Sequence, residues 1–155
     1  MKRLSFIFAI VIAIALLYSA CSHSKVIPEK FYKEYKATVI ENSSAESVSI
    51  LFRRPALHIE VRVPELIDKD ESVIILEITK AFATVDNINR IAEYAKWSPL
   101  WDVYLTIVNG SDDTVIHEFY AGYFKTSDAS DYSPENIDGY ETWRDITGGE
   151  IVIMP

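Results

Sequence analysis

The chain has 155 residues, of which 49% are hydrophobic and 25% charged, and its formal net charge at pH 7 is -8. This length fits one domain that buries its own core, and the acidic charge argues against a nucleic-acid-binding protein. The single cysteine, Cys21, excludes a disulfide within the chain and a metal site built from several thiolates.

The first residues have the order of an export signal. Lys2 and Arg3 form a short basic start, and residues 4–17 are apolar apart from Ser5. A basic start followed by a short apolar run is typical of a secretory signal peptide. We therefore predict that the rest of the chain works outside the cytoplasm.

The apolar run ends in Leu17, Tyr18, Ser19, Ala20 and Cys21. The last three residues resemble the lipobox of bacterial lipoproteins, in which Leu is usual at the place of Tyr18. The resemblance covers residues 1–21 only. It implies that residues 1–20 are removed and that Cys21 is acylated by fatty acids such as palmitate, since two or more chains anchor a protein stably. It also implies a protein anchored to the cell membrane or, given Ser22, to the outer membrane.

Two alternatives to the lipid anchor stay open at this point. The apolar run could be an uncleaved membrane anchor, although it is shorter than the roughly 20 residues that comfortably span a bilayer. The leader could also be cleaved without lipidation, which would release the domain. All three readings place the domain on the same side of the membrane.

Charge is divided unevenly along the chain. Residues 21–101 contain 11 Lys and Arg against 12 Asp and Glu, a net of -1, whereas residues 102–155 contain 2 against 11, a net of -9. An acidic surface of this kind repels nucleic acid and anionic lipid and attracts a cationic partner. Because Lys25, Lys30, Lys33 and Lys36 follow Cys21 closely, we expect a basic end near the membrane and an acidic half pointing away.

We predict a lipidated tether at 21–30 and one domain at 31–155, which begins with a short helix and a strand ending at Glu41. Alternation of apolar and polar residues predicts strands at 47–52 and, most clearly, at 57–63. His58 and Glu60 lie on the polar side of the second strand. They could begin a metal or acid–base site, but a solvated strand histidine is the commoner case.

The middle of the chain predicts helices. Asp68 with Glu71 three residues later is a capping pair, and the apolar residues after it fall at helical spacing to about Ala83. Asp86 is expected to cap a second helix that ends near Trp97. Together these helices occupy about 69–97, and we expect them to pack on one face of a sheet.

The last third predicts a hairpin of residues 102–108 and 114–124, because Asn109 and Gly110 supply the positive φ angles of a tight turn. A final strand at 150–154 is expected at the centre of the sheet or beside the hairpin. The predicted fold class is α+β, with an antiparallel sheet of about five or six strands and one or two helices on one face.

Aromatic residues among acids are the composition of a protein interface. We therefore predict that an acidic face binds a partner in the envelope, which would be basic, and an inhibitor or immunity protein is one form of this function. The predicted partner-binding residues are Tyr120, Tyr123, Tyr132, Tyr140 and Trp143.

The alternative is an envelope hydrolase. The chain has three His and lacks a glycine-rich phosphate loop and the Gly-x-Ser-x-Gly motif, so an enzyme would have to work through carboxylates such as Asp102, Glu118 and Glu150. Calcium could assist it at the polar loop 126–138, although the spacing there is not that of an EF-hand. The candidate calcium ligands are Asp128, Asp131, Glu135 and Asp138.

Overall fold

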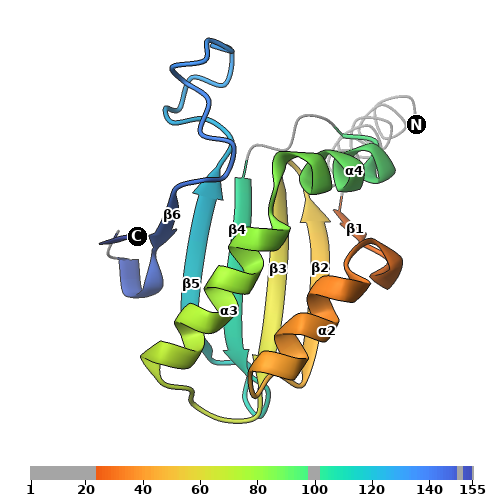
Figure 1. Ribbon diagram of the computed structural model, residues 1–155, viewed down its shortest axis with the longest axis vertical. Helices are drawn as coiled ribbons and strands as arrows, with labels where there is room; N and C mark the ends of the chain where they lie inside the picture. The colour runs from red at the N-terminus through yellow and green to blue at the C-terminus, as the bar shows by residue number, and fades with distance from the viewer. Residues whose placement is uncertain (1–23, 98–101, 150–151, 155) are drawn as a thin grey trace, which may run out of the picture.

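The computed structural model of the protein describes residues 24–97, 102–149 and 152–154. In this part of the chain seven strands form one sheet, in which each strand lies beside the next one in the sequence (Figure 1). The strands are β1 (Ser24–Val26), β2 (Ser47–Arg53), β3 (Ala56–Val63), β4 (Asp102–Asn109), β5 (Val115–Gly122), β6 (Trp143–Asp145) and β7 (Val152–Ile153). The α+β class with a mainly antiparallel sheet is confirmed, but the sheet has seven strands rather than five or six.

Three α-helices accompany the sheet in the described residues: α2 (Lys33–Asn42), α3 (Lys69–Phe82) and α4 (Val85–Ala95). α2 and α3 lie across one face, and α4 lies at the upper end of the sheet (Figure 1). β3 and β4 are the parallel pair, whereas the other neighbouring strands are antiparallel. A parallel pair needs a long crossover connection, and α3 with α4 supplies it. The predicted helices at about 69–97 are thereby confirmed.

The core lies between the sheet and the helices. In β3 the side chains of Leu57, Ile59, Val61 and Val63 are all 0% exposed, as their alternation predicts. The helices bring large apolar side chains against them, including Ile75, Leu76, Ile88 and Ile91. His58, Glu60 and Arg62, which alternate with them, are only half-buried, so along this stretch just one face of the strand meets the core.

The starts of α3 and α4 show how local side chains begin each helix. Asp68 caps α3 by accepting a hydrogen bond from the Glu71 backbone N–H at 2.8 Å, as predicted. The Glu71 carboxylate accepts from the Ser44 backbone N–H at 2.6 Å, so it ties α3 to the end of α2. α4 is capped by Thr84 rather than by Asp86, since the Thr84 side chain accepts from the Asn87 N–H.

The predicted strand ending at Glu41 is wrong, because residues 33–42 form the helix α2. Tyr35 and Val39 are one helical turn apart and both face the core, at 5% and 0% exposure. Tyr35 stacks on Phe82 with ring centroids 4.4 Å apart and shares a 2.8 Å hydrogen bond with Thr79. Packing against α3 therefore outweighs the strand preference of the β-branched Thr38, Val39 and Ile40.

Residues 24–30, predicted as a tether, belong to the folded domain. Ser24, Lys25 and Val26 pair with β2. Ile27 is 1% exposed in the core and donates its backbone N–H to the Ile50 carbonyl at 2.9 Å. The fold therefore begins at Ser24 or before it, and only Ser22 and His23 separate that point from Cys21.

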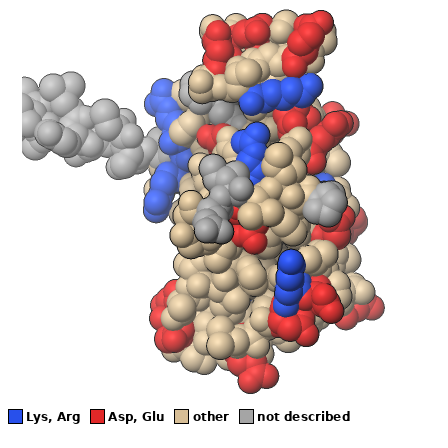
Figure 2. All heavy atoms as spheres, turned by 90° about the vertical axis from the view of Figure 1, so that its left-hand side faces the viewer, with Lys and Arg blue, Asp and Glu red and all other residues tan. Residues whose placement is uncertain are grey.

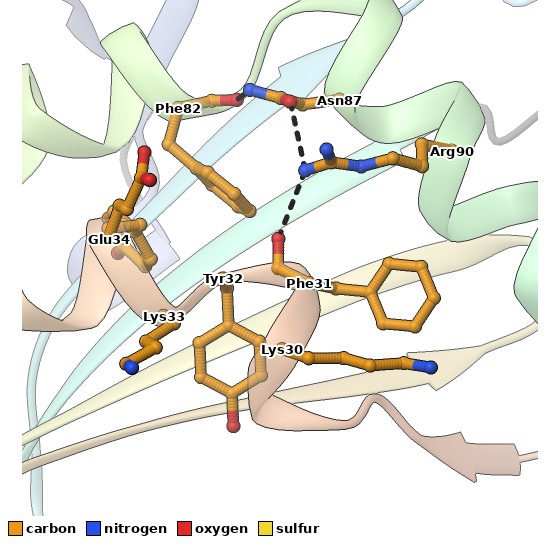
Figure 3. Close-up of a pocket in the computed structure, with 9 residues that line it drawn as sticks. Lys30, Phe31, Tyr32, Lys33, Glu34, Phe82, Asn87 and Arg90 are labelled. Carbon is orange, nitrogen blue, oxygen red and sulfur yellow. Dashed lines mark hydrogen bonds between the residues drawn. The ribbon is translucent and has the colours of Figure 1, made fainter.

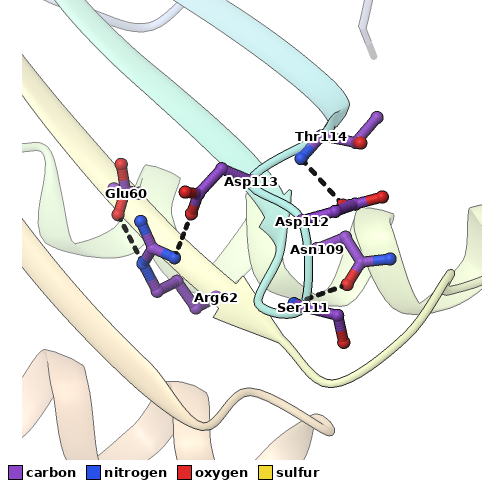
Figure 4. Close-up of polar contacts among 7 residues, drawn as sticks. All are labelled: Glu60, Arg62, Asn109, Ser111, Asp112, Asp113 and Thr114. Carbon is purple, nitrogen blue, oxygen red and sulfur yellow. Dashed lines mark hydrogen bonds and ion pairs between the residues drawn. The ribbon is translucent and has the colours of Figure 1, made fainter.

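The β4–β5 hairpin forms as predicted, but Gly110 has a different role from the one expected. The residue with positive φ is Asp113, at 59°. Gly110 is needed for close approach, because a Cβ there would lie 3.3 Å from the Val63 carbonyl oxygen. Asn109 and Asp112 accept backbone N–H groups within the turn, and Asp113 reaches across to Arg62 (Figure 4).

Strand register defines the two ends of the sheet. Ser24, Arg53, Ala56, Asp102 and Gly122 form one row across β1 to β5, which we call the upper end. The acidic loop 125–138 follows Gly122 and rises from this same end (Figure 1). The acidic loop is therefore not on the opposite side of the molecule from Ser24, as its distance along the sequence had suggested.

The C-terminal strand lies at the edge of the sheet rather than at its centre. β7 pairs only with β6, and β6 pairs with β5. In the edge view of Figure 2, acidic side chains gather at the top and at the base of the molecule. None of the helices in the described residues has the length and apolarity needed to cross a bilayer.

Candidate functional site

The sheet face turned away from the helices is the candidate site, and we call it the open face. By register, one row of side chains crosses this face on all seven strands: Val26, Leu51, His58, Tyr104, Tyr120, Arg144 and Ile153. These residues are intermediate in exposure or exposed, whereas their chain neighbours in β3, β4 and β5 face the core. No helix in the described residues covers this row (Figure 1).

Three rings form the middle of this row, and we call them the aromatic row. His58 stacks on Tyr104 with ring centroids 5.0 Å apart and an interplanar angle of 8°. Tyr104 meets Tyr120 at 5.3 Å with a tilt of 53°. The Arg144 guanidinium continues the row, 5.8 Å from the centroid of the Tyr120 ring. The sheet register thus builds one aromatic strip from β3, β4 and β5.

Two carboxylates flank the aromatic row. The Tyr120 hydroxyl donates a 2.8 Å hydrogen bond to Asp102, above the row. Glu118 lies one row below Tyr120 on β5, opposite Thr106. Burial raises the pKa of Tyr104, and the negative charges of Asp102 and Glu118 raise it further. Burial and the hydrogen bond to Asp102 also raise the pKa of Tyr120 well above its ordinary value. Both hydroxyls therefore stay protonated, and that of Tyr120 donates its proton to Asp102.

His58 is held in its neutral form. Burial lowers its pKa, and the charge of Arg53 lowers it further, while Asp102 acts in the opposite direction. A neutral imidazole stacked on Tyr104 adds a flat, uncharged ring to the aromatic row. This residue is therefore suited to contact rather than to carrying a permanent charge.

A pocket of about 240 Å³ opens where the aromatic row meets the loop 125–138. It is lined by Asp102, Tyr120, Phe124, Thr126, Ser127 and Ala129. Asn136, which is 4% exposed, holds the loop in shape: its side-chain oxygen accepts from Thr126, and its NH₂ group donates to the carbonyls of Asp128 and Asp131. These hydrogen bonds therefore fix the conformation of the loop residues that form the pocket wall.

The predicted calcium ligands are not brought together. Asp128 accepts hydrogen bonds from Ser130, Asp131 from the Ser133 backbone, and Asp138 from Thr142. Within the described ranges, which include Glu135 as well, no three His, Cys, Asp or Glu side chains are placed to hold a metal ion. These carboxylates shape turns of the loop and of the segment that follows it.

The predicted partner-binding aromatics are divided by the structure. Tyr120 lies on the open face, and Tyr132 is 57% exposed in the loop, in edge contact with Phe124 at 5.2 Å. Tyr123 is half-buried against Tyr140. Tyr140 and Trp143, at 4% and 0% exposure, are core residues. These two side chains are thus unable to touch a partner, because the hydrophobic effect places them between the sheet and the helices.

The carboxylates of the hydrolase alternative are also separated. Asp102 and Glu118 share the open face, but their rows are four strand positions apart, about 13 Å at ~3.3 Å per residue. Paired carboxylates in glycoside cleavage lie roughly 5 to 9.5 Å apart. Glu150, the third predicted residue, lies outside the described residues. Asp102 and Glu118 are therefore not placed as a catalytic pair of this kind.

Tyr104 is the residue of the aromatic row that sequence reasoning missed. Its alternation with Val103 and Leu105 places it on the polar side of β4, and His58 stands in the same position on β3. Only the parallel register places these two residues opposite each other. Sequence patterns carry no information on that register, so the aromatic row could not be predicted from the sequence.

A second pocket, of about 330 Å³, lies between the start of α2 and α4 (Figure 3). Arg90 spans it, donating to the Phe31 carbonyl and to the Asn87 side chain, both at 3.3 Å. Asn87 in turn donates to the Phe82 carbonyl at 2.9 Å. These contacts hold the helices together, so we assign this pocket a structural role.

Comparison with known proteins gives no match: neither a protein-family model, nor a curated protein, nor a solved structure is significantly similar to this chain. The function is therefore argued from the sequence and from the geometry of the open face.

Proposed function

We propose that this chain is a lipid-anchored, extracytoplasmic binding protein of the bacterial cell envelope, and that a protein partner covers its open face. The sequence of residues 1–21 supports the anchor. One observation carries the binding function: the rings of His58, Tyr104 and Tyr120 lie side by side on the sheet face that no described helix covers.

An antiparallel sheet can leave one face in water when that face is polar. Here the middle of the face is a contiguous strip of rings, extended on β2 by Leu51. Burying such rings against a partner removes apolar area from water, and aromatic anchors of this kind dominate protein interfaces. The aromatic row is therefore suited to be the centre of an interface.

The flanking charges favour a partner with basic side chains. Asp102 and Glu118 take no part in the ion pairs found between described residues. A partner's Lys or Arg on the aromatic row would meet the face of a tyrosine ring and either Asp102 above it or Glu118 below it. A partner with basic side chains is also the partner that the acidic composition of the chain predicts.

A substitution that covers the open face with a longer side chain tests the binding function. Thr106 is half-buried between Glu60 and Glu118, so in Thr106→Lys two neighbouring carboxylates accommodate the new charge while its chain covers the aromatic row. We expect binding of the partner to fall about 30-fold, which corresponds to the ~2 kcal/mol of an interface hot spot. The partner is first captured from envelope extract by photo-crosslinking, and its affinity is measured by titration.

Two controls accompany this measurement. Ile40→Ala removes an exposed apolar side chain from α2, on the other face of the sheet, and should leave the affinity unchanged. Melting of each variant shows whether it is folded. A captured protein that binds wild type and Thr106→Lys equally well would place the interface elsewhere and refute the open face as the site.

The anchor is tested separately through Cys21. In Cys21→Ala the acceptor of the acyl chains is missing, so we expect the chain to lose the mass of the lipid and the membrane attachment that depends on it. Mass spectrometry and membrane fractionation measure both. A Cys21→Ala chain that still fractionates wholly with membranes would refute the lipid anchor in favour of an uncleaved leader.

A further inference from the structure

Cations from two separate segments gather on one flank of the upper end. Arg53 ends β2 and pairs with Ser24, the first described residue. Arg54 follows it, with its guanidinium 3.6 Å from the centroid of the Trp97 ring. Lys96 ends α4 beside that tryptophan. We call Arg53, Arg54 and Lys96 the basic rim, and all three are exposed.

The basic rim keeps its charge available. None of its three residues belongs to an ion pair between described residues. By contrast, two of the four lysines that sequence reasoning placed at the membrane are engaged elsewhere. Lys25 donates to the Tyr94 carbonyl at 2.8 Å, and Lys36 forms an ion pair with Glu29 at 2.7 Å.

The basic rim lies close to the point of membrane attachment. Three residues of chain lead from Cys21 to Ser24, so they reach at most about 11 Å even when fully extended. Ser24 pairs with Arg53 in the sheet. A lipid on Cys21 would therefore hold Ser24 within about 11 Å of the attachment point, a distance of the same order as the ~8 Å Debye length at physiological salt.

The opposite end of the sheet carries the opposite charge. It is formed by the start of β2, the end of β3, the β4–β5 turn, the end of α2 and the start of α3. The acids of these segments, which we call the acidic pole, are Glu41, Glu46, Glu65, Asp68, Asp70, Glu71, Asp112 and Asp113. Two cations lie among them: Arg62, which forms ion pairs with Glu60 and Asp113 (Figure 4), and Lys69 at the start of α3.

We infer that the basic rim, with Trp97 beside it, rests on an anionic lipid surface and turns the acidic pole away from it. This orientation rests on the proposed membrane attachment and adds the surface that contacts the headgroups. Arginine and lysine next to an anionic bilayer are attracted to it, and the Trp97 ring holds the Arg54 guanidinium in place among them. The loop 125–138 rises from the β5 side of the upper end (Figure 1). Repulsion between the acids of this loop and the anionic lipid therefore tilts the domain toward the rim.

Energy transfer from the acidic pole to the bilayer tests this orientation. The full chain, purified from bacterial membranes, is reconstituted into phosphatidylcholine vesicles with or without phosphatidylglycerol and with an acceptor dye on the lipid. Ser111→Cys carries the donor, because Ser111 is exposed in the β4–β5 turn at the far end of the sheet. An eight-residue strand is about 27 Å long, so upright and tilted domains differ clearly in transfer.

On anionic vesicles we expect low transfer from the wild type and an about two-fold rise when Arg53, Arg54 and Lys96 are all replaced by Gln. The same rise in energy transfer is expected for the wild type at 1 M salt, because a Debye length of about 3 Å screens the attraction between the rim and the lipid. The matched control replaces Lys33, Lys69 and Lys80, three exposed or half-exposed lysines of α2 and α3 outside the rim, and should behave as wild type. Equal transfer from wild type and the rim variant on anionic vesicles would overturn the inference.

Mass spectrometry of the same sample separates this inference from the anchor. A chain without acyl groups refutes the lipid on Cys21, yet an uncleaved leader attaches the domain at the same end, so the transfer measurement still decides the role of the rim. If the chain is not membrane-attached at all, its co-sedimentation with anionic vesicles decides instead. Binding that the rim variant loses supports the inference, and absence of binding by wild type overturns it.

Discussion

At the residue scale, His58 shows how the open face is tuned by its neighbours. Its ring stacks on Tyr104 and is half-buried, and Arg53 lies close enough for its charge to disfavour protonation. Asp102 acts in the other direction but is the smallest of the three influences. The folded protein thus holds His58 neutral under conditions in which an unfolded chain begins to protonate it.

This shift predicts a pH dependence of stability. The folded-state pKa of His58 is lowered from 6.5, so between that pKa and 6.5 the unfolded state binds more protons, and stability rises with pH. The contribution of His58 is present above pH 6.5 and is lost as pH falls through the folded pKa. We expect the melting temperature to drop on acidification below 6.5, and less so in His58→Gln. Identical pH profiles for the two proteins would contradict this assignment.

At the element scale, the helices form where local signals and packing agree. α3 has a capping aspartate, apolar residues at helical spacing and a buried face against the sheet. α2 lacks a side-chain cap, and its β-branched residues favour a strand, yet it is helical because Tyr35 and Val39 fit between β2 and α3. Local signals were sufficient for α3, whereas α2 depends on contacts with segments distant in sequence.

The caps give a prediction at this scale. Asp68→Ala removes the acceptor of the 2.8 Å bond from the Glu71 N–H and should cost about 1 kcal/mol of unfolding free energy. Thr84→Ala should cost less, because its bond to the Asn87 N–H is 3.3 Å long. Urea denaturation measures both values. Asn89→Ala, at an exposed site within α4, is the control and should stay within ~0.5 kcal/mol of wild type.

At the scale of the whole molecule, a single core extends from the N-terminal strand to the short strands at the other edge. Ile27 beside β1 and Trp143 in β6 belong to the same buried cluster. Trp143 is 0% exposed and donates its indole N–H to the Tyr140 carbonyl at 3.0 Å. The C-terminal segment is therefore part of the domain rather than an appendage to it.

Trp143→Ala tests this unity of the core. Removing a fully buried indole should cost about 3–5 kcal/mol of unfolding free energy, in a single transition that includes the helices. Circular dichroism in urea is the suitable measurement, because it does not depend on the tryptophan signal. Tyr132→Ala, at 57% exposure, should cost less than ~0.5 kcal/mol. A loss of similar size in both variants would place Trp143 outside the core.

The sequence was sufficient for the α+β class, the strands at 47–52 and 57–63, the hairpin and the two helices at about 69–97, because period and capping are local properties. The export signal is local too, and it stays a prediction from residues 1–21. Tertiary structure alone decided what depends on register and packing: that His58, Tyr104 and Tyr120 form one row, that Tyr140 and Trp143 are buried, and that acids occupy both ends of the sheet. Register joins residues distant in sequence, and no local pattern contains it.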